Sequence, residues 1–270
     1  MRWYRSRMPD AVVDFDLLGP VRATCNGAEV RLGTPQRLSV LAVLLLSAGQ
    51  AVPTAVLRER LWAGPPPASA VSAIQVHMHH LRKTLRPYAH AVRIATHPGT
   101  PTDRVSYTLH ADDERIDVRR FRLLLNDGEA AQAQGNSHLA VAKFDAALNL
   151  WRGQPVSQLQ DSRYIVNLRR SLEDMWRDAA TRRAASRLAL GAVSQATAEL
   201  QDLHTQHPGD ERIVLLLSQA LWQDGAQGQA MRLVTDELDH MQRVHGLRPT
   251  ALLRQREELA RRVHDGRGSL

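Results

Sequence analysis

The chain has 270 residues, enough for one large domain or two ordinary ones, and its single cysteine, Cys25, excludes an internal disulfide. Its longest apolar run, "VLAVLLL" at 40–46, is far shorter than the roughly 20 residues that a membrane span needs, and no apolar signal core follows the cationic N-terminus. The formal net charge is +7, and residues 1–112 hold 13 Lys and Arg against 7 Asp and Glu, so they carry almost all of the excess. We therefore expect a cytoplasmic protein without membrane contact whose first part binds nucleic acid, although an ordinary basic domain would show the same charge.

The first predicted elements are short strands. Residues 12–19 alternate apolar and polar, and 21–32 divide around Asn26-Gly27, the pair that a two-residue hairpin turn favours. These strands are expected to form a small N-terminal sheet.

Three helices and a second hairpin are predicted next. Thr34-Pro35 opens a largely buried helix that ends near Gly49, and Thr54 is expected to cap a second helix that ends before three consecutive prolines at 65–67. Ser69 opens a third helix that ends at Pro87, and the strands 91–96 and 104–109 follow it. A small sheet, three helices and a C-terminal hairpin make up the order of a winged helix-turn-helix domain.

The third helix carries the clearest candidate site. At 100° per residue, Val71, Ile74, Met78, Leu81 and Leu85 form one apolar stripe that should face the core. The opposite side is polar and cationic, which suits contact with base edges and phosphates, although a solvated face would also be polar. Its predicted DNA-binding residues are Ser72, Gln75, Val76, His79, His80, Arg82, Lys83 and Arg86.

A metal site is the alternative interpretation of residues 77–80, which read "HMHH". His77 and His80 are three residues apart and could share an ion on a helix face, but structural zinc usually has four ligands. No Cys-x-x-Cys pair or second pair of histidines lies nearby, so the sequence predicts neither a metal nor a cofactor.

From about residue 114 the pattern is helical only. Gly135, Gly191 and Gly225 each end one predicted helix, and each is followed five residues later by an alanine inside the next helix: Ala140, Ala196 and Ala230. A tight turn and a small residue where helices cross are typical of helix-hairpin repeats. We therefore predict an N-terminal tail at 1–11, a winged helix-turn-helix domain at 12–112, an all-α tetratricopeptide-like domain at 114–264 and a tail at 265–270.

The two halves together resemble a known family. "LLGPVRATCNGAEVRLGTPQRLSVLAVLLLSAGQAVPTAVLRERLW" followed by "ASAVSAIQVHMHHLRKTL" is similar to the OmpR-type winged helix of SARP-type activators, the antibiotic regulatory proteins of secondary-metabolite gene clusters. "LNLWRGQP" (148–155) and "HPGDERIVLLLSQALWQDGAQGQAM" (207–231) resemble the bacterial transcriptional activation domain that those proteins carry. The resemblance covers residues 12–264.

The resemblance implies a mechanism. A dimer would bind direct repeats in double-stranded promoter DNA at the nucleoid, with the third helix in the major groove and the wing at the minor groove, and would recruit RNA polymerase and its sigma factor. By motif position, Val76, His80 and Arg82 match base-facing positions, and Lys83 matches a phosphate contact. Backbone or wing contacts are assigned to Gln36, Arg37, Arg104 and Tyr107. The family usually has Ser-Arg at 79–80 and a shorter Gly-Tyr wing turn, so the preferred DNA sequence should differ here.

The sequence leaves other functions open but does not favour an enzyme. The chain has only two lysines and no phosphate-binding loop, nucleophile elbow or His-Glu-x-x-His motif, so an enzyme is not expected. The alternatives are a helical-repeat adaptor or ligand sensor with weak DNA binding, and a repressor.

Overall fold

The computed structural model describes residues 12–47, 49–98 and 105–267. It divides the chain into two compact units, the first comprising 1–125 with 146–176 and the second 126–145 with 177–270. Within the described residues, no helix has the length and apolar character to cross a membrane.

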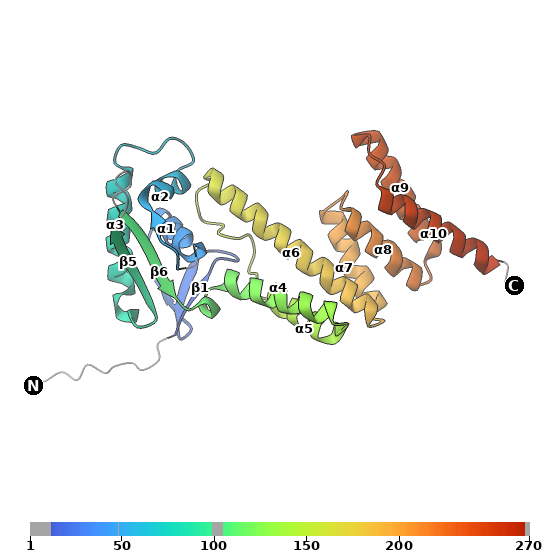
Figure 1. Ribbon diagram of the computed structural model, residues 1–270, viewed down its shortest axis with the longest axis horizontal. Coiled ribbons are helices and arrows are strands. Elements are labelled where there is room, and N and C mark those ends of the chain that lie inside the picture. Colours follow the sequence, from blue (N-terminus) through green and yellow to red (C-terminus); the bar gives the residue numbers. More distant parts are fainter. Residues whose placement is uncertain (1–11, 48, 99–104, 268–270) are drawn as a thin grey trace, which may run out of the picture. The chain divides into compact units, whose positions relative to one another are not determined.

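Up to residue 115, the described part of the first unit contains two small antiparallel sheets and three α-helices (Figure 1). One sheet has the order β1-β2-β3, and the other has the order β4-β6-β5. The elements up to residue 115 are β1 (Val13–Asp16), β2 (Arg22–Cys25), β3 (Ala28–Val30), α1 (Pro35–Leu46), β4 (Val52–Pro53), α2 (Thr54–Leu61), α3 (Ala70–Leu85), the 3-10 turn η1 (Arg86–Tyr88), β5 (Val92–Pro98), β6 (Val105–Ala111) and the 3-10 turn η2 (Asp113–Arg115).

The predicted N-terminal hairpin is confirmed. β2 and β3 pair on either side of Asn26 (φ 50°) and Gly27 (φ 82°), which are left-handed as the turn requires. The helix α1 is buried along most of its length, because eight consecutive residues from Leu38 to Leu45 lie in the core.

The expected cap of the second helix is wrong. Thr54 is the first residue of α2 and is buried, while Pro53 occupies the capping position. The Thr54 hydroxyl instead donates to the carbonyl of Val105 at 2.7 Å. This hydroxyl therefore ties the start of α2 to the second sheet rather than satisfying a free amide of its own helix.

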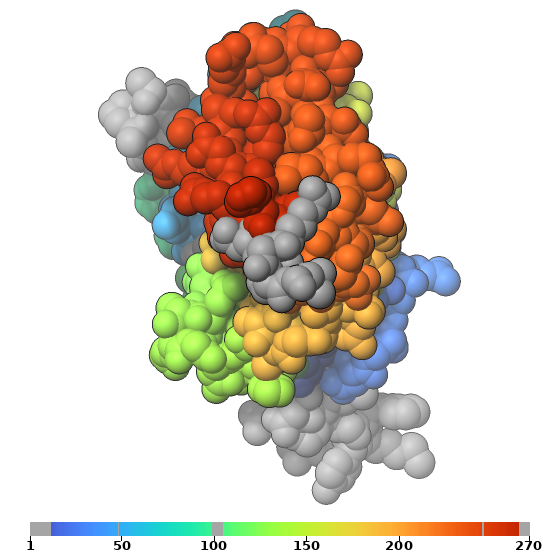
Figure 2. Space-filling model, turned by 90° about the vertical axis from the view of Figure 1, so that its right-hand side faces the viewer, coloured from blue at the N-terminus to red at the C-terminus, as the bar shows by residue number. Residues whose placement is uncertain are grey.

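The predicted helical half is confirmed. Its helices are α4 (Asp117–Ala133), α5 (Ser137–Leu148), α6 (Arg163–Ala189), α7 (Val193–Gln206), α8 (Glu211–Gln223), α9 (Gln227–His245) and α10 (Thr250–Arg267). The three glycines predicted to end helices all have positive φ, between 73° and 81°, and the three alanines that follow them are fully buried. The small-residue pattern thus marks close helix crossings. Helices α8, α9 and α10 contact one another (orange to red in Figure 2).

A charged cluster stabilises the second unit. Arg183 and Arg187 of α6 both bridge Asp145 and Glu199, with nitrogen to oxygen distances of 2.6–3.2 Å. Glu199 is only 11% exposed at its side chain, so two guanidinium groups compensate its buried charge.

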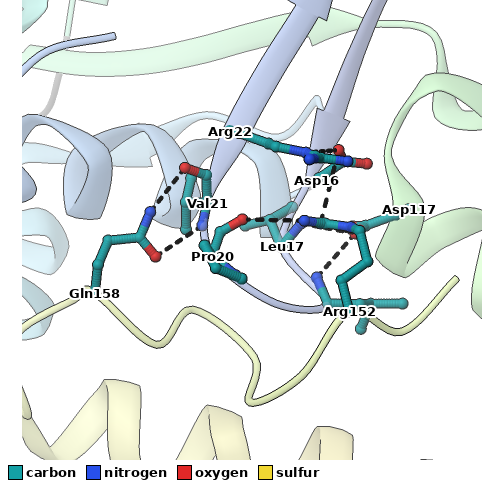
Figure 3. A network of polar contacts seen from close by, with 9 residues as sticks. Asp16, Leu17, Pro20, Val21, Arg22, Asp117, Arg152 and Gln158 are labelled. Carbon is teal, nitrogen blue, oxygen red and sulfur yellow. Dashed lines mark hydrogen bonds and ion pairs between the residues drawn. The ribbon is translucent and has the colours of Figure 1, made fainter. Parts of the chain in front are cut away.

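Segments far apart in sequence are joined within the first unit (Figure 3). The Asp117 carboxylate accepts from the backbone amides of Leu17 and Leu18 and lies 3.3 Å from an Arg152 nitrogen. The Gln158 amide both donates to and accepts from the backbone of Val21, at 2.7 and 2.8 Å. The predicted boundary near 113 therefore does not coincide with a gap in contacts, because 116–125 and 146–176 belong to the same compact unit as the first sheet.

Candidate nucleic-acid interface

Helix α3 presents one continuous exposed stripe. Its exposed members recur every three or four residues and continue into the first residue of η1: Ser72, the adjacent Gln75 and Val76, His79, Lys83 and Arg86. Val76 is 52% exposed in the middle of this stripe, although an aliphatic side chain of its size is usually buried. The stripe therefore combines hydroxyl, amide, imidazole and cationic groups with an apolar patch that could contact a thymine methyl.

The opposite side of α3 is buried, with one correction. Ile74, Met78, Leu81 and Leu85 are at most 3% exposed, as predicted, but Val71 is 41% exposed. Ala70 takes the place expected for Val71, because it lies one turn before Ile74 and is itself only 1% exposed. The prediction for Val71 is therefore wrong, because the buried face of α3 begins one residue earlier, at Ala70.

The histidines have three different environments. His79 is exposed and its ring contacts His80 edge to face, with 5.7 Å between the ring centroids. His77 is half-buried, and its Nδ1 is buried without a hydrogen-bond partner. Burial lowers the pKa of His77, and the nearby positive charge of Arg37 and His80 lowers this pKa further. His77 therefore belongs to the packing behind the stripe and favours its neutral form.

No metal-binding cluster accompanies these histidines. Among the residues that the structure describes, no group of three or more His, Cys, Asp and Glu side chains lies close enough to hold an ion.

The predicted backbone contacts at the start of α1 lie beside α3. Gln36 and Arg37 are both half-buried, and Arg37 Nη1 donates to the carbonyl of Leu32 at 3.2 Å. A Cβ at Gly33, whose φ is +104°, would lie 2.2 Å from the same nitrogen. The Arg37 side chain is therefore folded onto the loop before α1, close to His77, rather than extended from the surface.

Of the two predicted wing residues, the structure describes only one. Arg104 lies outside the described residues. Tyr107 lies on β6 between Thr96 of β5 and Val52 of β4 and is only 4% exposed. Its phenol is packed in the sheet, and this burial raises the pKa of Tyr107.

Arg82 is held by the hairpin. Its Nε donates to the carbonyl of Ile94 at 3.1 Å, and its Nη2 donates to the hydroxyl of Thr96. Its guanidinium also lies 5.7 Å from the centroid of the Tyr107 ring. Helical spacing could not predict Thr96 as a partner of Arg82, because the two residues are 14 positions apart and lie on different elements.

A buried helix, a second short helix, an exposed cationic helix and a following hairpin define a winged helix-turn-helix domain, a DNA-binding class of fold. The comparisons with known proteins agree. The family model described as "Transcriptional regulatory protein, C terminal" matches residues 27–100, and the model described as "Bacterial transcriptional activator domain" matches residues 116–259. The chain belongs to the SARP family of transcriptional regulators.

Three similar regulators illustrate the match. The transcriptional regulator RedD of Streptomyces coelicolor is 32% identical over 90% of this chain and 69% of its own length. The regulatory protein DnrI of Streptomyces peucetius is 28% identical over 94% of both chains. The transcriptional regulatory protein EmbR of Mycobacterium tuberculosis is 31% identical over 81% of this chain, which spans only 55% of EmbR's length. All three relatives are regulatory proteins.

A solved structure has the same architecture. Mycobacterium tuberculosis EmbR in complex with a low-affinity phosphopeptide superposes with a TM-score of 0.84 and 28% identity, covering 94% of this chain and 66% of the EmbR chain.

Proposed function

We propose that this protein is a sequence-specific activator of a secondary-metabolite gene cluster. Two protomers bind direct repeats in a promoter and recruit RNA polymerase with its sigma factor. The observation that carries the proposal is the exposed stripe of α3, because it places groups suited to base edges and phosphates on one face of the helix that this fold offers to the major groove.

The composition of the stripe gives each residue a role. Gln75 and His79 are placed to form hydrogen bonds with base edges, and Val76 is placed to contact a thymine methyl. Lys83 and Arg86 lie toward the C-terminal end of α3 and supply charge for the backbone phosphates. His80 is half-buried against His79 and restricts the orientation of that ring.

The helical half, residues 114–264, supplies the activating surface in this proposal. Support comes from the match of the activator-domain model, which covers residues 116–259. The DNA-binding residues all precede 112, so the functional division into 12–112 and 114–264 is proposed even though packing crosses it.

Transcription from a defined promoter tests the proposal. Purified protein, RNA polymerase holoenzyme and the promoters beside the protein's own gene are combined, and the transcript is measured. An activator raises the transcript from a promoter that it protects, whereas a reduced transcript would make the protein a repressor. Unchanged transcription without specific DNA retention would favour the adaptor.

Lys143→Ala is the matched control for replacing Lys83, the lysine of the exposed stripe. Lys143 is the only lysine besides Lys83, and it pairs with Asp127 in the second unit at 2.8 Å. Its loss should leave DNA binding unchanged.

A further inference from the structure

Arg82 joins three parts of the first unit through one side chain. It leaves the last turns of α3 and contacts both strands of the following hairpin, through Ile94 and Thr96 on β5 and the Tyr107 ring on β6. Thr96 and Tyr107 are direct partners in the β5–β6 register. The guanidinium therefore contacts the paired residues Thr96 and Tyr107 and, two residues earlier on β5, the carbonyl of Ile94.

The partner strand explains why the contact matters. β5 is an edge strand, since the sheet order is β4-β6-β5. An edge strand leaves alternate backbone groups without a partner in the sheet, and Arg82 supplies a charged donor to one carbonyl of this strand. Two directed donors on a planar group fix both the distance and the angle between α3 and β5, which a lysine ammonium could not do.

The geometry also limits what Arg82 can offer to DNA. Its side chain is half-buried, whereas the next residue, Lys83, is exposed. A guanidinium that extended into the major groove would leave Ile94 and Thr96 and would abandon the Tyr107 ring.

From this geometry we propose that Arg82 is a positioning residue, which holds the wing hairpin at a fixed offset from α3 so that helix and wing meet successive grooves together. Base choice then falls to the exposed stripe. This inference rests on the proposed DNA-binding function and reassigns Arg82, which the family motif places among the base-facing residues.

Three variants of the full-length chain separate positioning from base contact. Arg82→Ala removes the contact, Arg82→Lys keeps the charge without the planar fork, and Thr96→Val removes one acceptor at nearly constant volume. Each is tested by hydroxyl-radical footprinting and by affinity for a series of singly substituted sites.

If Arg82 positions the wing, all three variants should lose binding in the same way. Arg82→Ala and Arg82→Lys each weaken binding to the best site by about tenfold, the loss expected for a charge-assisted contact, and both lose protection on the wing side of the footprint. Thr96→Val shows the same loss more weakly, and combining it with Arg82→Ala adds nothing. The order of preference among the substituted sites stays that of the parent.

The opposite pattern overturns the inference. If Arg82→Ala relaxes preference at one base pair and keeps wing-side protection, Arg82 contacts a base. If Arg82→Lys binds like the parent, or Thr96→Val binds more tightly, the hairpin contact does not position the wing. A parent protein without any specific footprint would instead overturn the proposed function and this inference together.

Amide hydrogen exchange without DNA gives an independent test. Arg82→Ala and Thr96→Val should both speed exchange in residues 92–98 while the buried part of α3 remains protected. Unchanged exchange in β5 would overturn the inference even if DNA binding is weakened.

Discussion

Both carboxylate oxygens of Asp117 lie 2.8 Å from the backbone nitrogen of Leu17, one hundred residues earlier in the chain. One of them also accepts from Leu18, and Arg152 adds an ion pair from the segment before α6. A side chain at the start of α4 thus accepts hydrogen bonds from the backbone amides that directly follow β1. The winged helix and the first part of the helical half are consequently one packed body.

The protonation of Asp117 should give the protein a distinct pH dependence. Burial raises the pKa of Asp117 to about 6, against the lowering effect of its backbone hydrogen bonds and of Arg152. The folded state therefore holds this proton more tightly than the unfolded state. Its contribution to the free energy of unfolding is largest below pH 4 and falls by about 3 kcal/mol as the pH rises to 6.

Asp117→Asn should remove that component. Urea unfolding of both proteins from pH 4 to 7 measures it. The difference in the free energy of unfolding between parent and variant should change across this pH range and become constant above it. A difference that does not vary with pH would show that Asp117 titrates normally.

Truncation should show how far the DNA-binding half depends on later residues. A winged helix-turn-helix domain at 12–112, as the sequence predicts, would be expected to fold without the rest. The contacts of Asp117, Arg152 and Gln158 with the first sheet indicate otherwise, since each buried hydrogen bond contributes about 1 kcal/mol and their loss would also uncover Leu17 and Leu18.

Thermal unfolding of two fragments measures this dependence. Residues 1–176 should give a cooperative transition, and 1–112 should unfold at a much lower temperature or without a cooperative transition. Equal melting temperatures would mean that these contacts contribute little to stability.

Lys83→Ala should weaken binding to all DNA sequences by a similar factor. Lys83 is exposed near the C-terminal end of α3, and in the proposed complex it contacts a phosphate, so its loss should reduce the slope of log affinity against log salt by about one. Titration at several salt concentrations measures the slope, with Lys143→Ala as the control. A changed base preference with an unchanged slope would place Lys83 at a base.

Gly128→Ala should destabilise the second unit. Alanine normally favours a helix over glycine by about 1 kcal/mol, but a Cβ here would lie 2.6 Å from the buried Phe144 ring. Overpacking of this kind costs about 1–3 kcal/mol, so the clash should exceed the gain in helix propensity.

Gly228→Ala is the matched control. The added Cβ would lie 3.5 Å from Nη1 of Arg232, at the flexible end of that side chain, so this substitution should be neutral or stabilising. Denaturant unfolding distinguishes the two, and equal effects would show that Phe144 moves aside.

Local patterns predicted much of this fold. Asn26-Gly27 marked the first hairpin, and the glycine–alanine spacings marked the helix crossings, because turn geometry and close packing depend on neighbouring residues. Helical spacing also predicted most of the exposed stripe of α3, but it placed Val71 in the core and His80 on the exposed face, whereas Val71 is exposed and His80 is half-buried.

Contacts between distant segments could not be predicted in this way. Helical spacing placed Arg82 on the flank of the stripe, but only the folded hairpin provides its partners on β5. The same reason applies to Thr54, whose acceptor is 51 residues away, and to Asp117.

Footprinting of the purified protein on the promoters beside its own gene, at two salt concentrations with excess competitor DNA, tests the central claim most directly. We expect a protected pair of direct repeats about one helical turn apart that survives the competitor. Diffuse retention that disappears with salt would show that α3 binds phosphate without sequence preference, and would contradict sequence-specific recognition by this protein.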